Sequence, residues 1–250
     1  MRSPDGRERR RLTMGRRPDL DWSHACRDCA VGTSAVCSTL DVTALADLRN
    51  QGSSIQLAAG QPLFHQGDPA DRTFSLTSGV VKLYSVLPDG RRQVIAFHFP
   101  GEFIGFSPSE DYHCTAEAVS AATLCRFETG RFEQFARSSD ELARSRHERV
   151  ARDLVAAQTR AMVLGQAAAR ERLAHFLCDV HRRSQARPAG ASGIVPLPMS
   201  RSDIAEYLGL AKETVSRELS ALRATGIVRT ISRNLLEIRD MERLRRLAIV

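Results

Sequence analysis

Three cysteines near the start of the chain have the spacing of a metal site. Two residues separate Cys26 from Cys29, and seven separate Cys29 from Cys37. Thiolates at this spacing can hold one metal centre and favour zinc or iron–sulfur clusters over hard cations. A four-ligand site needs one more thiolate, for which the chain offers three candidates: Cys114, Cys125 and Cys178. The spacing leaves open the fourth ligand and the choice between zinc and a [4Fe–4S] cluster.

A second group of residues has the chemistry to read DNA. Glu213, Ser216 and Arg217 stand at positions i, i+3 and i+4 of an expected helix, so they share one face. Glutamate can accept a hydrogen bond from cytosine N4, arginine can donate two to guanine, and serine can serve either. Contacts to phosphates are expected from three other residues: Thr214, Ser200 and Arg201. The alternative is an ordinary surface helix in which Glu213 and Arg217 form an ion pair.

The segment 200–224 predicts the element that positions these side chains. Residues 200–203 read as a capping box with Asp203 in place of the usual glutamate, and they open a first helix. Gly209 supplies a turn, and a second helix follows over 212–224. Small Ala205, Gly209 and Val215 allow two helices to pack across a tight turn, which is typical of a helix-turn-helix. Segments 227–231 and 235–238 are expected to form a β-hairpin wing.

Upstream, the sequence predicts a β domain and then a long helix. Glycines recur about every ten residues between 55 and 127, and 87–90 reads as a hairpin turn, which favours an antiparallel sandwich or jelly roll. The expected helix over 130–170 carries apolar and alanine residues with heptad steps, a pattern suited to pairing with a second copy. Five positions of this predicted dimer seam are Val150, Leu154, Ala157, Ala161 and Leu164. The seam is narrow and rich in alanine, so we expect weak association, and a helix packing on its own domain is the alternative.

These elements give an α+β chain with five parts. We expect a disordered basic tail over 1–20, a cysteine-rich leader over 21–40, a β-roll sensor domain over 41–129, a dimerisation helix over 130–170, and a winged helix-turn-helix domain over 171–250.

Composition agrees with a DNA-binding role. The 250 residues carry a net charge of +7, and residues 171–250 hold fourteen basic against nine acidic side chains. A basic domain is the electrostatic footprint of a nucleic-acid binder. The sequence offers neither a membrane-spanning run nor a secretory signal, so we expect a cytoplasmic protein without membrane contact. No nucleophile–base arrangement or phosphate-binding glycine loop is present, so we expect no enzyme.

Along most of its length the chain resembles the CRP/FNR superfamily of bacterial transcription regulators. Within it, the chain is most similar to the oxygen-responsive FNR branch, in particular its FnrL-like members. The resemblance is carried by five stretches: CRDC with AVC, PGEFIGF, AEAVSAATLCRF, ARERLAHFL and ETVSR.

The resemblance implies a cofactor, a fold and a function. It implies a [4Fe–4S] cluster held by Cys26, Cys29, Cys37 and Cys125, a β roll like that of cyclic-nucleotide-binding domains, and a homodimer. It further implies an oxygen-sensing regulator that binds double-stranded DNA at an inverted repeat with TTGAT half-sites. The loop 88–92 would contact RNA polymerase, although a plain hairpin is an equal reading. The cyclic-nucleotide branch has an Arg-Ser pair where residues 113–116 here read His-Cys-Thr-Ala, so we expect no cyclic nucleotide.

Two regulators of the same fold remain as alternatives. One holds zinc at the cysteines and does not sense oxygen. The other uses the cluster to respond to nitric oxide or to redox state.

Overall fold

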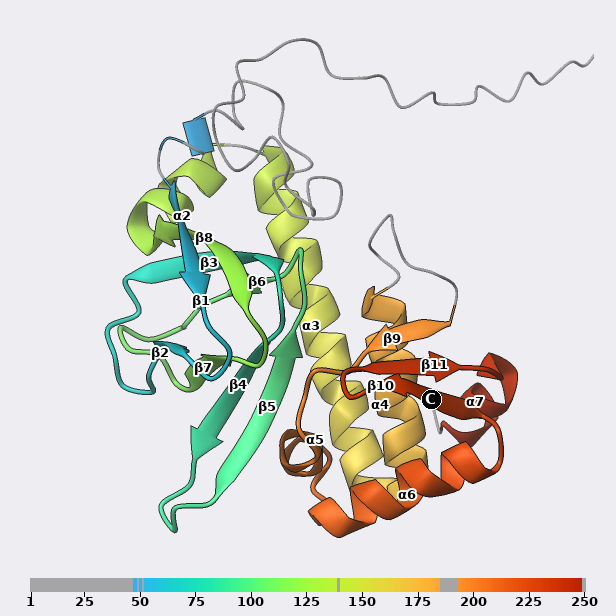
Figure 1. The fold of residues 1–250 in the computed structure, drawn as a ribbon. Helices are drawn as coiled ribbons and strands as arrows, with labels where there is room; N and C mark the ends of the chain where they lie inside the picture. Colours follow the sequence, from blue (N-terminus) through green and yellow to red (C-terminus); the bar gives the residue numbers. More distant parts are fainter. Residues whose placement is uncertain (1–46, 49, 51, 139, 185–192, 249–250) are drawn as a thin grey trace, which may run out of the picture.

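The computed structural model describes residues 47–48, 50, 52–138, 140–184 and 193–248. The expected tail and leader, with Cys26, Cys29 and Cys37, lie outside the described residues. The described chain forms a β domain and a helical C-terminal domain, with the long helix α3 (Asp140–Gln166) running past both (Figure 1).

The β domain is a sandwich of two antiparallel four-stranded sheets. One sheet has the order β1 (Gly52–Leu57), β8 (Ala122–Glu128), β3 (Arg72–Ser78), β6 (Phe103–Ile104). The other has the order β2 (Pro62–Phe64), β7 (Thr115–Ala118), β4 (Val81–Val86), β5 (Arg92–His98). Buried apolar residues of both sheets, among them Leu76, Val81 and Leu124, fill the space between them. The expected β-roll architecture is confirmed.

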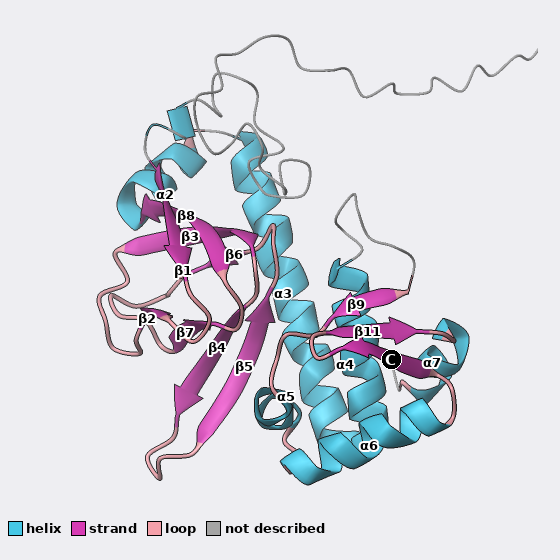
Figure 2. Cartoon of the chain, viewed as in Figure 1, coloured by secondary structure: helices cyan, strands magenta, loops and turns pink. Residues whose placement is uncertain are grey.

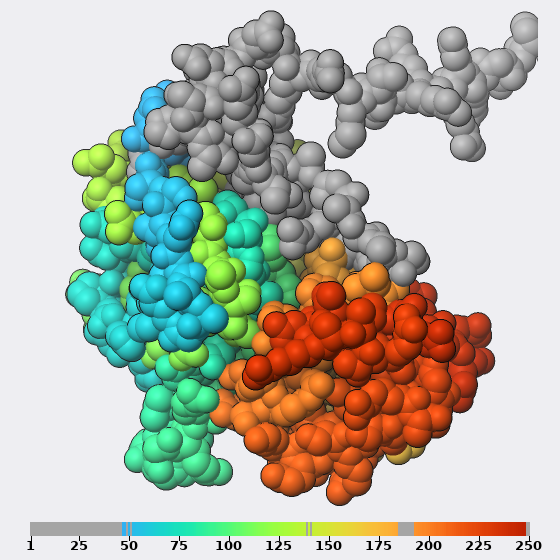
Figure 3. All heavy atoms as spheres, in the orientation of Figure 1, coloured from blue at the N-terminus to red at the C-terminus, as the bar shows by residue number. Residues whose placement is uncertain are grey.

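The hairpin between β4 and β5 extends away from the sandwich. Its turn is residues 87–90, as the sequence predicts, and Gly90 has φ 83°, a conformation that side chains with a Cβ rarely adopt. The space-filling view shows this hairpin protruding from the β domain, beside the C-terminal domain (Figure 3). Val86 and Leu87 are exposed there.

The prediction of a single helix over 130–170 is wrong in one respect, because the structure has two helices, α2 and α3, in this segment. α2 (Thr129–Arg137) ends at Ser138, and α3 begins at Asp140. The Ser138 hydroxyl donates to Phe135 O at 2.8 Å, a local bond that competes with continued helix. Phe132 of α2 and Leu142 of α3 are both buried in one apolar cluster, which also contains Phe103 and Phe127. The break therefore lets both helices pack on the end of the sandwich.

The described part of the C-terminal domain combines helices with a small sheet (Figure 2). Its helices are α4 (Ala169–Ser184), α5 (Arg201–Leu208), α6 (Lys212–Ala224) and α7 (Met241–Leu247). Its antiparallel sheet has the order β10 (Val228–Ser232), β11 (Leu235–Ile238), β9 (Ile194–Pro196). The hairpin β10–β11 is the expected wing.

The two domains share one apolar core. Val94, Phe97 and Phe99 of the β domain belong to the same buried cluster as the interior of α4, α5 and α6. The Phe97 ring lies 5.1 Å from that of Tyr207 on α5. Within the described residues, no helix has the length and apolar character needed to cross a membrane.

Candidate nucleic-acid interface and cysteine site

The first helix of the helix-turn-helix begins with the capping box that the sequence predicts. Ser200 Oγ accepts from Asp203 N at 3.0 Å, and Asp203 Oδ2 accepts from Ser200 N at 3.1 Å. At its other end, Gly209 adopts the left-handed conformation, with φ 61°. This residue type permits the sharp turn to α6. Ala205 and Val215 are buried between the two helices, so the predicted packing is present.

α6 presents the predicted base-reading residues to solvent. Val215, Leu219 and Leu222 form its buried side. Glu213, Ser216 and Arg217 are all exposed on the opposite side. In the described part of the chain, the ion-pair partner of Arg217 is Glu218, Nε to Oε1 3.7 Å, and not Glu213. The surface ion pair considered as an alternative therefore does not occupy this face.

The three predicted phosphate-contacting residues differ in availability. Arg201 is half-buried, and burial followed by the neighbouring charge of Arg223 lowers its pKa below the ordinary value. The combined positive charge of Arg201 and Arg223 favours an anion such as a phosphate. Thr214 is half-buried at the start of α6. The Ser200 hydroxyl donates to Asp203 Oδ2 at 2.6 Å, so a phosphate would have to replace this bond.

The helix-turn-helix is fixed to the β domain by a buried charge triad, which the sequence analysis missed. Lys82 Nζ on β4 donates to Asp203 Oδ1 at 2.7 Å and lies 3.0 Å from Glu117 Oε1 on β7. Burial alone would lower the pKa of Lys82, but the two carboxylates raise it, so the amine stays charged. Asp203 thus caps α5 and anchors it. The capping motif is visible in the sequence, but its partner 121 residues away is not.

The apolar face of α3 is left uncovered, as expected for a dimer seam. Val150 and Leu154 are 60% and 58% exposed, and Ala157 and Ala161 are exposed as well. Leu164 is half-buried beside the turn at Gly209.

The seam is also broader than the heptad pattern predicts. Val155 and Met162, each one residue further round the helix than a seam position, are 59% and 56% exposed. Large apolar side chains exposed together mark an interaction surface.

The three described cysteines lie in different environments. Cys125 is half-buried on β8 and packs against the cluster at the end of the sandwich. Cys114 is buried just before β7, and burial raises the pKa of its thiol to about 11. Cys178 packs against the C-terminal core, and burial likewise raises its pKa. Among the described residues, no group of three or more potential ligands is arranged for a metal ion.

Both domains match known protein families. The Crp-like helix-turn-helix domain matches residues 171–247, and the cyclic nucleotide-binding domain matches residues 54–139. The nitrogen fixation regulation protein FixK of Bradyrhizobium diazoefficiens is 40% identical over 208 residues, covering 83% of this chain and 87% of its own. The chain belongs to the CRP/FNR family of transcription regulators.

Two further relatives of this regulator agree. The transcriptional activator protein FnrL of Cereibacter sphaeroides is 30% identical over 224 residues, covering 88% of this chain and 90% of its own. The structure of FixK2 from Bradyrhizobium japonicum superimposes with a TM-score of 0.73 at 32% identity, covering 80% of this chain and 98% of its own. CRP/FNR regulators are dimers that bind DNA and are not enzymes. The expected function class is therefore confirmed.

Replacing Arg217 tests the exposed face of α6. Arg217→Ala should weaken binding to a duplex with the expected TTGAT inverted repeat by about 1–3 kcal/mol, because the expected base-edge contact would be lost. Fluorescence anisotropy at fixed salt measures it. Arg246→Ala, which removes an exposed ion pair with Glu242 on α7, is the control. An equal loss of affinity on a scrambled duplex would show that Arg217 contacts phosphate and reads no base.

The Cys114 thiol should make the protein sensitive to alkali. Its folded pKa of about 11 exceeds the unfolded value, so between pH 9 and 11 the unfolded chain loses this proton first. The free energy of unfolding should therefore fall as pH rises, by on the order of 2 kcal/mol. Cys114→Ala should remove this part of the slope in urea titrations under reducing conditions. Parallel curves for the two proteins would contradict it.

Proposed function

We propose that the chain is an oxygen-sensing transcription regulator whose [4Fe–4S] cluster is held by Cys26, Cys29, Cys37 and Cys125. Family membership does not by itself assign a cofactor. The proposal depends on the four thiols of this chain, because soft thiolates are the ligands that such clusters take.

The observation that carries the proposal is the position of Cys125 relative to the first described residues of the chain. Leu48 packs into the same apolar cluster as Phe103 and Phe127, and Cys125 lies against that cluster. Cys37 is eleven residues before Leu48, and eleven residues can span up to about 35–40 Å. The described chain thus begins at the apolar cluster against which Cys125 packs, and Cys37 is close enough in sequence to reach it.

The other two described cysteines fit a ligand role less well. The burial that raises the pKa of Cys114 and Cys178 opposes the thiolate form that metals need. Cys178 in addition lies on α4 and packs against a different apolar cluster from Cys125.

When bound, such a cluster supplies an iron–sulfur centre that oxygen destroys. With it bound, Cys125 would tie the leader to β8, against the apolar cluster that includes Leu142 in the first turn of α3. α3 then pairs along its exposed apolar face, and the two copies of α6 enter successive major grooves of an inverted repeat. Without the iron–sulfur cluster this tie would be absent, so pairing of α3 would weaken and specific DNA affinity would fall.

A cyclic nucleotide is not part of this proposal. Where the cyclic-nucleotide branch has its Arg-Ser pair, this chain has His113, Cys114, Thr115 and Ala116. The Thr115 hydroxyl accepts from Gln66 N at 3.0 Å, and Cys114 and Ala116 are buried. This stretch has no arginine for a phosphate.

Contact with RNA polymerase is assigned to the protruding β4–β5 hairpin. Its turn carries Asp89 and Arg91, whose side chains pair at 2.7 Å, beside exposed Leu87. An exposed tip with both charge and apolar surface suits a protein partner.

Cys125→Ser should abolish both the cluster and anaerobic DNA binding. Protein purified without oxygen should hold about four iron per chain and an absorption band that bleaches in air. The variant should lack iron and bind the duplex only non-specifically. Cys178→Ser is the matched control and should keep both properties.

Three outcomes would count against this assignment. Iron and DNA binding retained in Cys125→Ser would reject Cys125 as a ligand. Colourless wild-type protein that holds zinc would support a regulator that does not sense oxygen. A spectrum that responds to nitric oxide but not to air would support the other alternative.

Ala157→Leu should strengthen dimers in air, because it adds apolar area at the centre of the exposed α3 face. Sedimentation velocity over a concentration series should show a lower dissociation constant, by about tenfold. A profile identical to that of the wild type would place the dimer contact elsewhere.

A further inference from the structure

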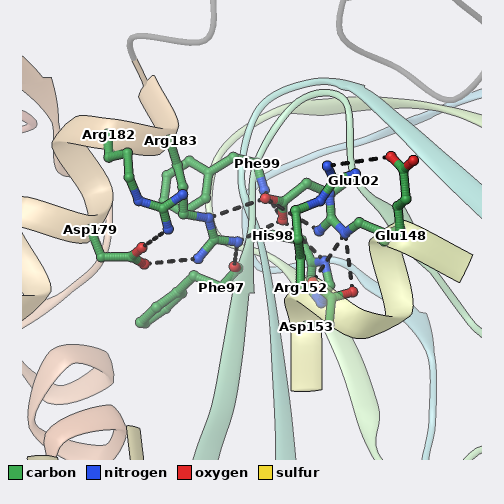
Figure 4. Close-up of polar contacts among 11 residues, drawn as sticks. Phe97, His98, Phe99, Glu102, Glu148, Arg152, Asp153, Asp179, Arg182 and Arg183 are labelled. Carbon is green, nitrogen blue, oxygen red and sulfur yellow. Dashed lines mark hydrogen bonds and ion pairs between the residues drawn. The ribbon is translucent and has the colours of Figure 1, made fainter. Parts of the chain in front are cut away.

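The Glu102 carboxylate is buried where three parts of the chain meet (Figure 4). Glu102 lies in the loop between β5 and β6. Its Oε2 accepts from Arg183 Nη2 on α4 at 2.6 Å, and its Oε1 lies 3.4 Å from Arg149 Nη2 on α3. Oε2 also accepts from Phe99 N at 3.1 Å. One side chain of the β domain thus contacts the dimer helix and the DNA-binding domain.

These contacts keep Glu102 ionised despite its burial. Burial acts to raise its pKa, but the adjacent His98, Arg183 and Arg149 outweigh burial and hold the pKa well below its usual range. Arg183 is fixed in turn, because its Nη2 donates to Phe97 O at 2.6 Å. A buried charge is tolerated only with its partners in place. Asp153 also pairs with Arg149, and Asp179 with Arg183, each on the same helix as its arginine. Glu102 is the partner that ties both arginines to the β domain.

The backbone beside Glu102 is joined to Cys125 by one row of residues across the sheet. Ser75 of β3 pairs with Cys125 of β8 on one side and with Phe103 of β6 on the other. Adjacent strands are about 4.8 Å apart, so Phe103 lies about 10 Å from Cys125. Glu102 O also accepts from Leu76 N of β3 at 2.9 Å. A shift of β8 reaches the Glu102 loop through paired backbone.

We propose that Glu102 is the positioning residue through which the state of the cysteine site sets the placement of α3 and α4 together. This inference rests on the proposed function for its input, Cys125. The structural change that results acts through the two arginines. Arg149 places the dimer helix α3, and Arg183 places the domain that carries α6. One displacement of the loop thus changes both the seam and the angle of the recognition helix.

A merely stabilising ion-pair cluster would behave differently from a coupling residue. It would lower thermal stability when broken but leave the response of DNA binding to oxygen unchanged. A test of coupling must therefore measure both the placement of α3 and α4 and the response of DNA binding to oxygen.

Hydrogen exchange on the air-purified full chain tests the output without any cluster. Glu102→Gln should speed amide exchange by about tenfold in α4 and in the half of α3 around Arg149. Arg149→Gln, a milder change near the surface, should do so in α3 alone. Arg152→Gln removes only an exposed pair with Glu148 on the same helix and should change neither. Unchanged exchange in α4 of Glu102→Gln would overturn the proposal.

The ratio of anaerobic to aerobic affinity for the inverted repeat tests the coupling. In Glu102→Gln, iron content should equal that of the wild type while this ratio falls by about tenfold. A ratio equal to the wild type at equal iron content would overturn the proposal. Absence of iron in the wild type would instead overturn the proposed function, and the exchange experiment would still decide whether Glu102 positions the two helices.

Discussion

The orientation of the DNA-reading helix depends on charged side chains that leave water at the junction of the two domains. Removing an ion from water costs several kcal/mol unless partners compensate for it. Lys82 is 5% exposed and forms ion pairs with Asp203 and Glu117. Glu102 forms ion pairs with Arg183 and Arg149. A small rotation of the C-terminal domain would separate these pairs and leave buried charge without a partner. The apolar core shared by the domains would tolerate such a rotation far better, because apolar contact is not directional.

α3 is more than a connector between the domains. Arg160 Nη2 donates to Val94 O on β5 at 2.8 Å and to Tyr207 O on α5 at 3.3 Å, and its guanidinium lies 4.2 Å from the centre of the Tyr207 ring. The inner side of the helix is thus committed to both domains of its own chain, whereas the outer side, with Leu154 and Met162, is uncovered. A partner helix packed on the outer side would therefore act on a helix, α3, that already contacts both the β domain and the C-terminal domain.

Local signals in the sequence predicted most of the elements but not their junction. The turn at 87–90, the cap at Ser200 and the turn at Gly209 depend on residues a few positions apart, and the structure places them as expected. The break at Ser138 was missed because the heptad pattern that predicted the helix lies wholly beyond it. Val155 and Met162 were missed because a strict heptad follows a single seam. The links from Lys82 to Asp203 and from Glu102 to Arg183 join residues 121 and 81 positions apart, and charged residues give no periodicity that would pair them.

The double role of Asp203 bears on how such regulators can exchange domains in evolution. A recombination point between α3 and α4 would separate Lys82 from Asp203 and Glu102 from Arg183. A new C-terminal domain that lacked either partner would leave a buried charge unmatched, even with its capping box and recognition helix intact. A DNA-binding domain must therefore be exchanged together with the charged residues that pair with the β domain. A regulator of this construction changes its DNA target more readily by substitution on α6 than by acquiring a new domain.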